Sequence, residues 1–408
     1  MTSLIARDAD AFLHQVGSSP VEKTFRAVDG IWAEDHSGHR FMDFQGNTCH
    51  NIGYRHPRLI QALKDQLDAL PFTPRGFTNE PAVELAEQLS ELWPYGKGRV
   101  LFGLSGADAI EMALKLAYVA TGRVKTLAFE DSWHGAALGA VWAGGRAAER
   151  QGFPVFAGCH HVPPFWARRR GEGGDEAATA ALAAIASHLR QGDFACFLAE
   201  PIRSTPHMPP AWFWPEVRRL CDASGTLLIF DEVPTGLGKT GRLFASEHFD
   251  AAPDMTVLGK SLGGGALPLS AVIARDALNR SGHLAIGHYT HQKNPLLARA
   301  GLVTLDILRQ EELAARAAAL GREALQRLGE IAQASPLFRA ARGSGLLMAI
   351  EAENPAELPG LRKACFAAGL HLGIADNRFL GLSPPLTIGP DELRQALDIV
   401  ADLHNARP

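Results

Sequence analysis

Short apolar segments alternate with amphipathic segments through the central part of the chain. Between residues 108 and 121, apolar side chains recur at spacings of three to four, which predicts an amphipathic helix. The alanine-rich segment 177–189 predicts a second helix. Continuous apolar runs that end at polar or glycine-rich positions predict strands buried on both faces, at 126–129, 195–199, 226–230 and 256–258. Strands that alternate with helices indicate an α/β fold with a parallel sheet, in which ligands bind at the carboxyl ends of the strands.

The C-terminal part of the chain has a different pattern. Residues 310–334 predict one long helix, and residues 343–351 predict a strand. We therefore expect a smaller α+β domain in this region. A chain of 408 residues is long enough for two or three domains.

Composition and charge exclude several classes of protein. Five cysteines, an odd number without a CxxC pair, predict neither a disulfide framework nor a cysteine zinc site. The net charge of −4 is unlike that of a nucleic-acid-binding protein, and the basic run 168–170 is interpreted as a solvated loop. The N-terminus lacks a signal-peptide pattern, and no apolar run is long enough to span a membrane. We expect a cytoplasmic protein without membrane or nucleic-acid partners.

Two positions at the ends of predicted elements could bind a charged ligand. Ser105, Gly106 and Ala107 begin the helix at 108–121, where unpaired N–H groups favour an anion, although alone this signal is weak and an ordinary helix cap is the alternative. Asp231 ends the strand at 226–230, and a carboxylate there needs a cation or hydrogen-bond donors. A capped strand end is the alternative for Asp231.

Lys260 follows the strand at 256–258 and is a candidate nucleophile. A desolvated lysine in a cleft can attack an aldehyde as a Schiff-base amine, whereas most lysines are simply exposed. The pair Trp133-His134 adds an aromatic ring after another strand. An anion site, a strand-end carboxylate, an amine and a stacking ring are together what pyridoxal 5′-phosphate (PLP) requires.

Other motifs are excluded by their spacing. The tripeptide at 238–240 resembles the end of a P-loop, but Val233 occupies the position of the required first glycine. The three glycines at 263–265 lack the spacing of a dinucleotide-binding fingerprint. The histidines show no metal-ligand spacing, so no metal site is predicted.

Ordered motifs along nearly the whole chain resemble the class III (ω-amino acid) aminotransferase family of fold-type I PLP enzymes. They lie at 30–35, 41–46, 53–57, 105–106, 133–135, 200–201, 231–241, 259–260, 290–295, 342–346 and 383–386. The resemblance implies a mostly parallel seven-stranded sheet in a large PLP-binding domain, 65–305. It also implies a small α+β domain formed by residues 1–64 and 306–408, and a homodimer with shared active sites.

The resemblance also implies a role for individual residues. Lys260 would bind the cofactor aldehyde covalently, and Asp231 would hold the pyridinium nitrogen. Ser105, Gly106 and Ala107 would bind the phosphate, Trp133 would stack on the ring beside His134, and Thr290 would contact the phosphate of the neighbouring subunit. Glu200 would lie near the substrate.

Three positions depart from the family pattern. Pro234 replaces a glutamine that hydrogen-bonds the cofactor, and Ala107 replaces a serine or threonine of the phosphate site. Gly381 replaces the arginine that grips a substrate carboxylate. Arg378 lies three residues earlier, and because strand side chains alternate between faces, that odd offset turns it away.

Within the family, the segments 44–50, 70–81, 200–203 and 287–293 resemble a phosphonate-breakdown branch of ammonia-lyases. This resemblance implies a primary-amine substrate that carries a phosphonate, and elimination of ammonia without a keto acid. Arg203 and Arg75 are then candidate phosphonate ligands, and His50 and His291 are candidate acids. An aminotransferase of an ω-amine or amino acid is the alternative, and a non-catalytic cofactor-binding protein is a third hypothesis.

Overall fold

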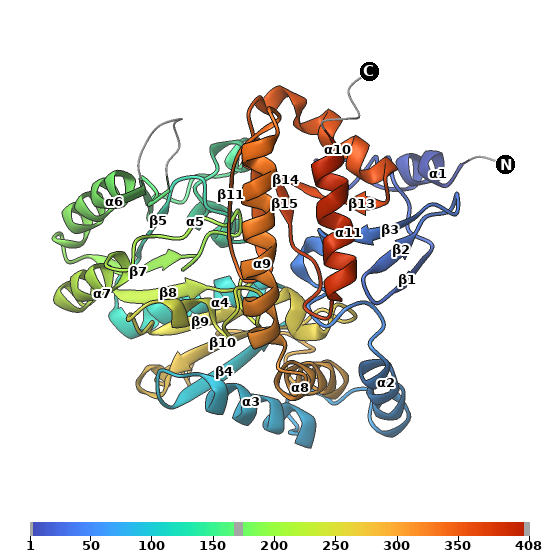
Figure 1. Cartoon of the computed structure of the whole chain (residues 1–408). Coiled ribbons are helices and arrows are strands. Elements are labelled where there is room, and N and C mark those ends of the chain that lie inside the picture. The colour runs from blue at the N-terminus through green and yellow to red at the C-terminus, as the bar shows by residue number, and fades with distance from the viewer. Residues whose placement is uncertain (1–2, 167–173, 404–408) are drawn as a thin grey trace.

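The computed structural model describes residues 3–166 and 174–403. The basic run at 168–170, interpreted as a solvated loop, lies outside the described residues. A seven-stranded sheet forms the centre of the chain, in the order β4-β10-β9-β8-β7-β5-β6 (Figure 1). Its strands are β4 Gly98–Gly103, β5 Lys125–Phe129, β6 Cys159–Val162, β7 Phe194–Ala199, β8 Leu227–Asp231, β9 Met255–Leu258 and β10 Ser270–Arg275. Because β10 alone is antiparallel to its neighbours, the prediction of a mostly parallel sheet is confirmed.

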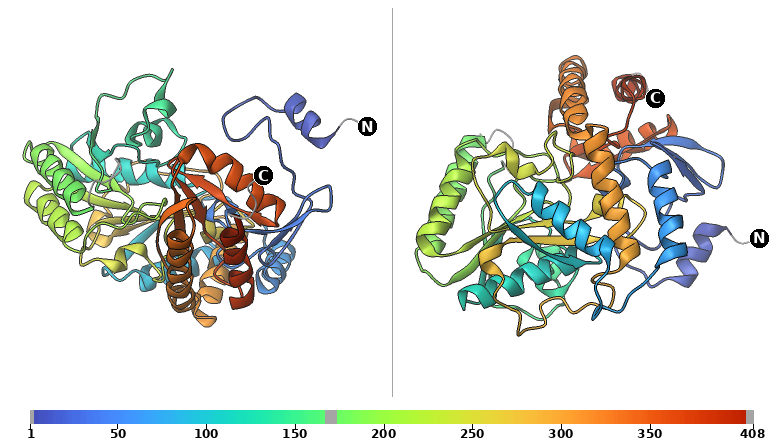
Figure 2. Two further views of the ribbon diagram at one scale, coloured as in Figure 1. Left: turned by 45° about the horizontal axis from the view of Figure 1, so that its top comes forward. Right: turned by 90° about the horizontal axis from the view of Figure 1, so that it is seen from below.

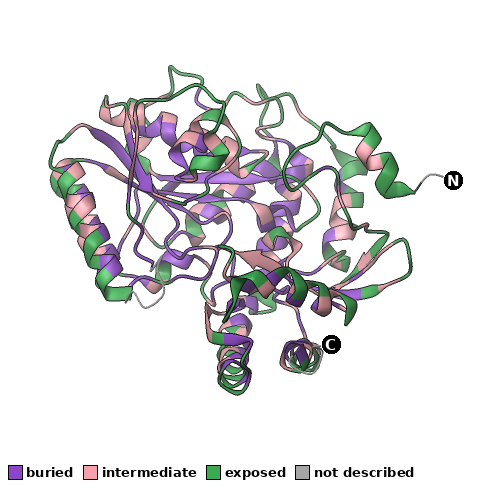
Figure 3. Cartoon of the chain, turned by 90° about the horizontal axis from the view of Figure 1, so that it is seen from above, coloured by how far each residue is buried: buried purple, intermediate pink, exposed green. Residues whose placement is uncertain are grey.

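Helices cover both faces of this sheet, so its strands are apolar at successive positions rather than at alternate ones. In β7, Cys196 and Leu198 pack with α4 (Gly106–Thr121), whereas Phe197 and Ala199 pack with α6 (Gly174–Leu189) and α7 (Phe213–Ser224). Figure 3 shows the strands buried between helices whose outer faces are exposed. The remaining helices on this part of the chain are α3 Glu80–Leu92, α5 Leu138–Ala143 and α8 Pro295–Gln310.

Two smaller sheets lie beside the large one (Figure 2). The first joins β1 Ala27–Asp29, β2 Trp32–Glu34 and β3 Arg40–Asp43 to β13 Leu370–His371, which brings the two ends of the chain together. The second contains β11 Phe338–Ser344, β12 Leu347–Ala352, β15 Phe379–Leu382 and β14 Gly373–Ala375. The accompanying helices are α1 Leu4–Ala11, α2 Pro57–Ala69, α9 Leu313–Ala334, α10 Leu358–Ala367 and α11 Pro390–Ala401. The sequence-based domain boundaries at 64 and 305 fall inside α2 and α8.

The structure confirms most of the predicted elements and corrects one. The expected strand at 343–351 is wrong: β11 turns at Gly345, whose φ of +55° favours glycine, and returns as β12. The long helix expected at 310–334 is confirmed as α9, which begins at Leu313 because Glu312 adopts a left-handed conformation between α8 and α9. All five cysteines are free, and no cluster of metal-ligating side chains exists among the described residues. None of the helices described is long and apolar enough to cross a membrane.

Candidate active site

The carboxyl ends of five strands carry the candidate residues, as the sequence predicted. Ser105 follows β4, Trp133 and His134 follow β5, and Glu200 follows β7. Asp231 ends β8, and Lys260 comes two residues after β9. Parallel strands end at the same edge of a sheet, so these loops form one site.

The N-terminus of α4 is arranged to receive an anion. The Ser105 hydroxyl accepts a hydrogen bond from the Asp108 N–H at 3.1 Å, and the Asp108 carboxylate accepts one from the Ser105 N–H at 3.0 Å. This reciprocal cap leaves the first N–H groups of the helix, at Gly106 and Ala107, directed out of the helix without an intrahelical acceptor. Backbone groups of this kind bind phosphate without any side-chain hydroxyl at position 107.

Close backbone packing joins this helix end to the neighbouring loops. A Cβ atom on Gly135 would lie 2.8 Å from the Cβ of Ala107, so the loop after β5 rests directly on the helix start. A Cβ on Gly106 would lie 3.1 Å from Val233, and one on Gly259 would lie 3.2 Å from the same side chain. The anion site is therefore in contact with the loops that carry Trp133, Asp231 and Lys260.

Asp231 is buried and fixed through both carboxylate oxygens. One oxygen lies 2.7 Å from Nδ1 of His134, and the other accepts a hydrogen bond from the Val233 N–H at 3.0 Å. The Nε2 atom of His134 has no protein partner among the described residues. His134 thus positions Asp231, a function that its place beside Trp133 in the sequence does not indicate.

Lys260 has the backbone and the electrostatics of a reactive amine. Its φ of +46° is uncommon for a residue with a side chain, and such strain concentrates at functional sites. Burial lowers the pKa of Lys260, against the opposing effect of the nearby carboxylates of Asp231 and Glu200. A lowered pKa increases the fraction of neutral amine, which is the nucleophilic form.

A cavity of about 450 Å³ opens over Lys260. Trp133 and Pro234 line it on the side of the large sheet, and Gly381 lines it on the side of β15. Its polar side chains include Gln45, Asn47 and Thr48, from a turn in which both Asn47 and Thr48 have positive φ. Among the described residues that line this cavity, none is an arginine.

Comparison with known proteins identifies the family. The family model for aminotransferase class III matches residues 15–403. The chain is 35% identical to an (R)-1-hydroxy-2-aminoethylphosphonate ammonia-lyase of Vibrio splendidus, over 97% of the chain and 88% of that relative. It is 33% identical to an ornithine aminotransferase of Bacillus cereus, over 92% of the chain and 93% of the relative. The chain belongs to the class III aminotransferase family.

Solved structures of aminotransferases have the same fold. A Bacillus anthracis aminotransferase superposes with a TM-score of 0.90 at 29% identity, over 99% of the chain and 98% of that structure. A PLP-bound amine transaminase from an uncultivated Pseudomonas species gives 0.89 at 27% identity, over 97% and 98%. This class III chain is therefore a PLP-dependent enzyme. The open N–H groups of α4, the fixed carboxylate of Asp231 and the strained, half-buried Lys260 suit that cofactor.

Arg203, a candidate substrate ligand, lies buried behind the cavity of this class III enzyme. One of its terminal nitrogens donates to the Glu200 carboxylate at 2.6 Å, and the other donates to the Asp131 carbonyl at 2.7 Å. Asp376, on the turn between β14 and β15, lies 3.8 Å from the guanidinium. Arg203 is thus occupied by protein groups, and it joins the loop after β7 to the small sheet.

Within a single chain, the other candidate side chains do not line the Lys260 cavity. Arg75 is exposed and donates to the His288 carbonyl at 2.7 Å. Thr290 and His291 are exposed and do not line the cavity. Burial lowers the pKa of His50 to about 4, so this side chain is neutral near pH 7 and is no proton donor there.

Sequence reasoning missed two groups behind the cavity, Asp376 and His207. The His207 ring lies 3.5 Å from the Asp376 carboxylate and accepts a hydrogen bond at Nδ1 from Arg342, at 2.9 Å. Because a guanidinium can only donate, Nδ1 is unprotonated and the proton resides on Nε2. Asp376 and Asn377 are residue types that readily adopt positive φ, and this sequence signal could have predicted the hairpin turn. It could not have predicted that His207 lies against that turn.

Proposed function

We propose that this enzyme is an ammonia-lyase that converts (R)-1-hydroxy-2-aminoethylphosphonate to phosphonoacetaldehyde and ammonia, in the breakdown of phosphonates. The observation that carries the proposal is the lining of the Lys260 cavity, which has Gly381 and, among the described residues, no arginine. An aminotransferase must bind a keto acid in the same cavity to regenerate its cofactor, and an arginine there is the usual ligand for such a carboxylate. A lyase needs no second substrate. The similarity to the Vibrio splendidus enzyme supports the same activity.

When bound, PLP would supply an electron sink for the electron pair left when the carbon next to the substrate nitrogen loses its proton. Asp231, held by His134, keeps the ring nitrogen protonated, and this preserves the sink. Lys260, with its lowered pKa, takes the proton from the carbon that bears the amine. The loop after β5 places Trp133 in the wall of the Lys260 cavity.

The atoms balance without an oxidant or a keto acid. The neighbouring carbon loses its hydroxyl group, which leaves with a proton as water. Loss of the hydroxyl leaves a carbon–carbon double bond next to the nitrogen. A proton returned to the carbon that bore the hydroxyl converts it to a carbon–nitrogen double bond, and hydrolysis of that bond consumes one water and gives the aldehyde and ammonia. The hydroxyl needs a hydrogen-bond partner as it leaves, and we propose the neutral polar side chains of Gln45, Asn47 and Thr48, which line the cavity.

We further propose that the enzyme is a homodimer with shared active sites. Thr290 is exposed in the single chain, as is Ser105 at the start of α4, and a partner subunit would cover both. Phe72 and Phe77 add exposed apolar surface in the loop between α2 and α3, with 40% and 67% of their areas exposed. Sedimentation velocity of the holoenzyme should give the mass of two chains, and a monomer at micromolar concentration would contradict the proposal.

An aminotransferase that acts on an ω-amine or amino acid is the second candidate, supported by the similarity to the Bacillus cereus ornithine aminotransferase. The two activities separate in one incubation with the hydroxy-aminophosphonate and no keto acid. The lyase should release many molecules of ammonia per active site. A single turnover that stalls and resumes only when pyruvate or 2-oxoglutarate is added would overturn the lyase proposal. Lys260→Ala is the inactive control for both reactions.

A further inference from the structure

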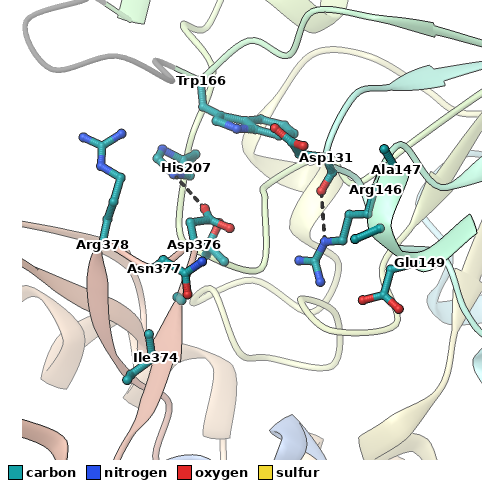
Figure 4. Close-up of a pocket in the computed structure, with 13 residues that line it drawn as sticks. Asp131, Arg146, Ala147, Glu149, Trp166, His207, Ile374, Asp376, Asn377 and Arg378 are labelled. Atoms are coloured by element: carbon teal, nitrogen blue, oxygen red, sulfur yellow. Dashed lines mark hydrogen bonds and ion pairs between the residues drawn. The ribbon is translucent and has the colours of Figure 1, made fainter. Parts of the chain in front are cut away.

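A second, larger cavity adjoins the Lys260 cavity. Its volume is about 920 Å³, and its lining includes Arg146, Glu149 and Asp376 (Figure 4). Ile374 and Ala375, on β14, line both cavities, so the two spaces meet at this strand.

The loop after β7 separates the two cavities with alternate side chains. Ser204 and Pro206 line the Lys260 cavity, whereas Thr205 and His207 line the larger one. A substrate whose amine reacts at Lys260 therefore has the larger cavity as its neighbouring space. A charged group on that substrate requires a cation at the junction, because the Lys260 cavity contains no arginine among its described lining residues.

Most of the arginines near this junction already have carboxylate partners. Arg203 is bound to Glu200 at 2.6 Å. Arg342 and Arg378 share Glu351, at 3.2 Å and 2.7 Å. Recruiting Arg203 to a substrate would leave the buried Glu200 carboxylate without its cation, which is strongly unfavourable. Arg342 or Arg378 would have to divide its charge between the substrate and Glu351.

Arg146 differs from these side chains. Among the described residues it forms no ion pair, and its single hydrogen bond runs from Nε to the Asp131 carbonyl at 3.3 Å. The two terminal nitrogens, which form the fork that binds phosphonate or carboxylate, remain available. Figure 4 shows the guanidinium extending into the open cavity.

Arg146 is also tied to the reaction site through Trp133. Its guanidinium carbon lies 5.9 Å from the centre of the Trp133 ring, and that ring lines the Lys260 cavity. The arginine therefore stands beside the aromatic wall of the Lys260 cavity, on the side of the larger cavity.

We propose that Arg146 binds the anionic group of the substrate, a phosphonate, while the substrate amine reacts at Lys260; this assignment rests on the proposed function. The substrate spans the junction of the two cavities, and its phosphonate faces the fork of Arg146. The carboxylates of Asp376 and Glu149 affect how strongly Arg146 binds the anionic group of the substrate. Asp376 lies 3.8 Å from the Arg203 guanidinium and 3.5 Å from Nε2 of the neutral His207 ring, whereas Glu149 is exposed, forms no ion pair among the described residues and competes with the ligand for Arg146.

Binding of two amines to the holoenzyme tests the assignment without requiring turnover. 2-Aminoethylphosphonate has the amine and the phosphonate but no hydroxyl to eliminate, and ethanolamine has the amine without the phosphonate. Both are titrated by the change in the absorption of the cofactor. Loss of a charge-assisted, two-pronged contact in Arg146→Ala should weaken binding of the phosphonate amine by about 10- to 100-fold and leave ethanolamine within about twofold.

Arg150→Ala is the matched control. Arg150 lies on the same segment and packs over Trp142 at 5.3 Å, but it lines a different cavity. Its removal should change neither affinity, whereas Glu149→Gln should tighten phosphonate binding several-fold because a competing charge is lost. Equal weakening of both amines in Arg146→Ala, or no weakening of the phosphonate amine, would overturn the role of Arg146. Wild-type enzyme that does not prefer the phosphonate amine would overturn the anionic substrate itself, which is a separate result.

Discussion

Replacing Arg203 by methionine should destabilise the enzyme strongly, because this side chain connects charged groups of both domains. Its side chain is 1% exposed, and it donates to Glu200 at 2.6 Å and to the Asp131 carbonyl at 2.7 Å. Asp376 lies 3.8 Å away on the small-domain hairpin. Methionine keeps an unbranched apolar stem but is shorter and cannot donate, so Glu200, which is 5% exposed, would remain charged and buried without its cation.

The expected loss is about 3–5 kcal/mol in the free energy of unfolding, the usual cost of removing one partner of a buried ion pair. Urea unfolding of the PLP-saturated enzyme, followed by tryptophan fluorescence, measures it. Glu200→Gln removes the charge that would be stranded, so the double variant should be more stable than the sum of the single losses predicts, by roughly 1–3 kcal/mol.

The refuting result is an Arg203→Met enzyme with wild-type stability and a large rise in KM for the phosphonate substrate alone. That outcome would make Arg203 a substrate ligand, and the ion pairs around it would have no structural importance. A loss of stability with unchanged substrate affinity at low urea would support a structural role for Arg203.

Two further predictions follow from the geometry of the site. Gly135→Ala should weaken PLP binding by about 10- to 100-fold, since the new Cβ would lie 2.8 Å from that of Ala107 and the φ of +126° is unfavourable for alanine. Fluorescence titration of the apoenzyme with PLP measures this affinity. A wild-type affinity would contradict the close packing of Gly135 on Ala107. Burial lowers the pKa of His207 below its ordinary value of 6.5, so near and below that pH the folded enzyme binds fewer protons than the unfolded chain does. The neutral His207 ring therefore stabilises the fold fully above pH 6.5, and this stabilisation is lost as the pH falls below that value. His207→Gln should make stability less dependent on pH below about 6.5, and an unchanged pH profile in urea unfolding would contradict this.

The sequence predicted the central sheet well because its strands are buried on both faces. The run at 195–199 is continuously apolar, and the structure buries every residue of β7. Helix α4 was predicted from its apolar spacing and begins at Gly106, within two residues of the expected start. By contrast, the segment 343–351 was expected to be one strand although it begins with Gly-Ser-Gly, which is a turn signal, and the structure turns there at Gly345 with a positive φ.

Site residues could be located from the sequence when they lie directly at the end of a predicted strand. Asp231 and Lys260 could be located in this way, since both follow buried runs. The partners of Arg203, His207 and Arg342 could not be predicted, because most of them come from segments that lie far apart in the sequence. An arginine in a loop has the same local sequence pattern whether it binds a substrate or a buried carboxylate, and only the tertiary structure distinguishes the two.

Covalent attachment of the cofactor to Lys260 can be measured by reducing the holoenzyme with sodium borohydride and mapping its peptides by mass spectrometry. Attachment at this residue predicts loss of the cofactor absorption band and a stable pyridoxyl adduct on Lys260, with no adduct in Lys260→Ala. An adduct on another lysine, or a reconstituted protein with neither the absorption band nor an adduct, would contradict it.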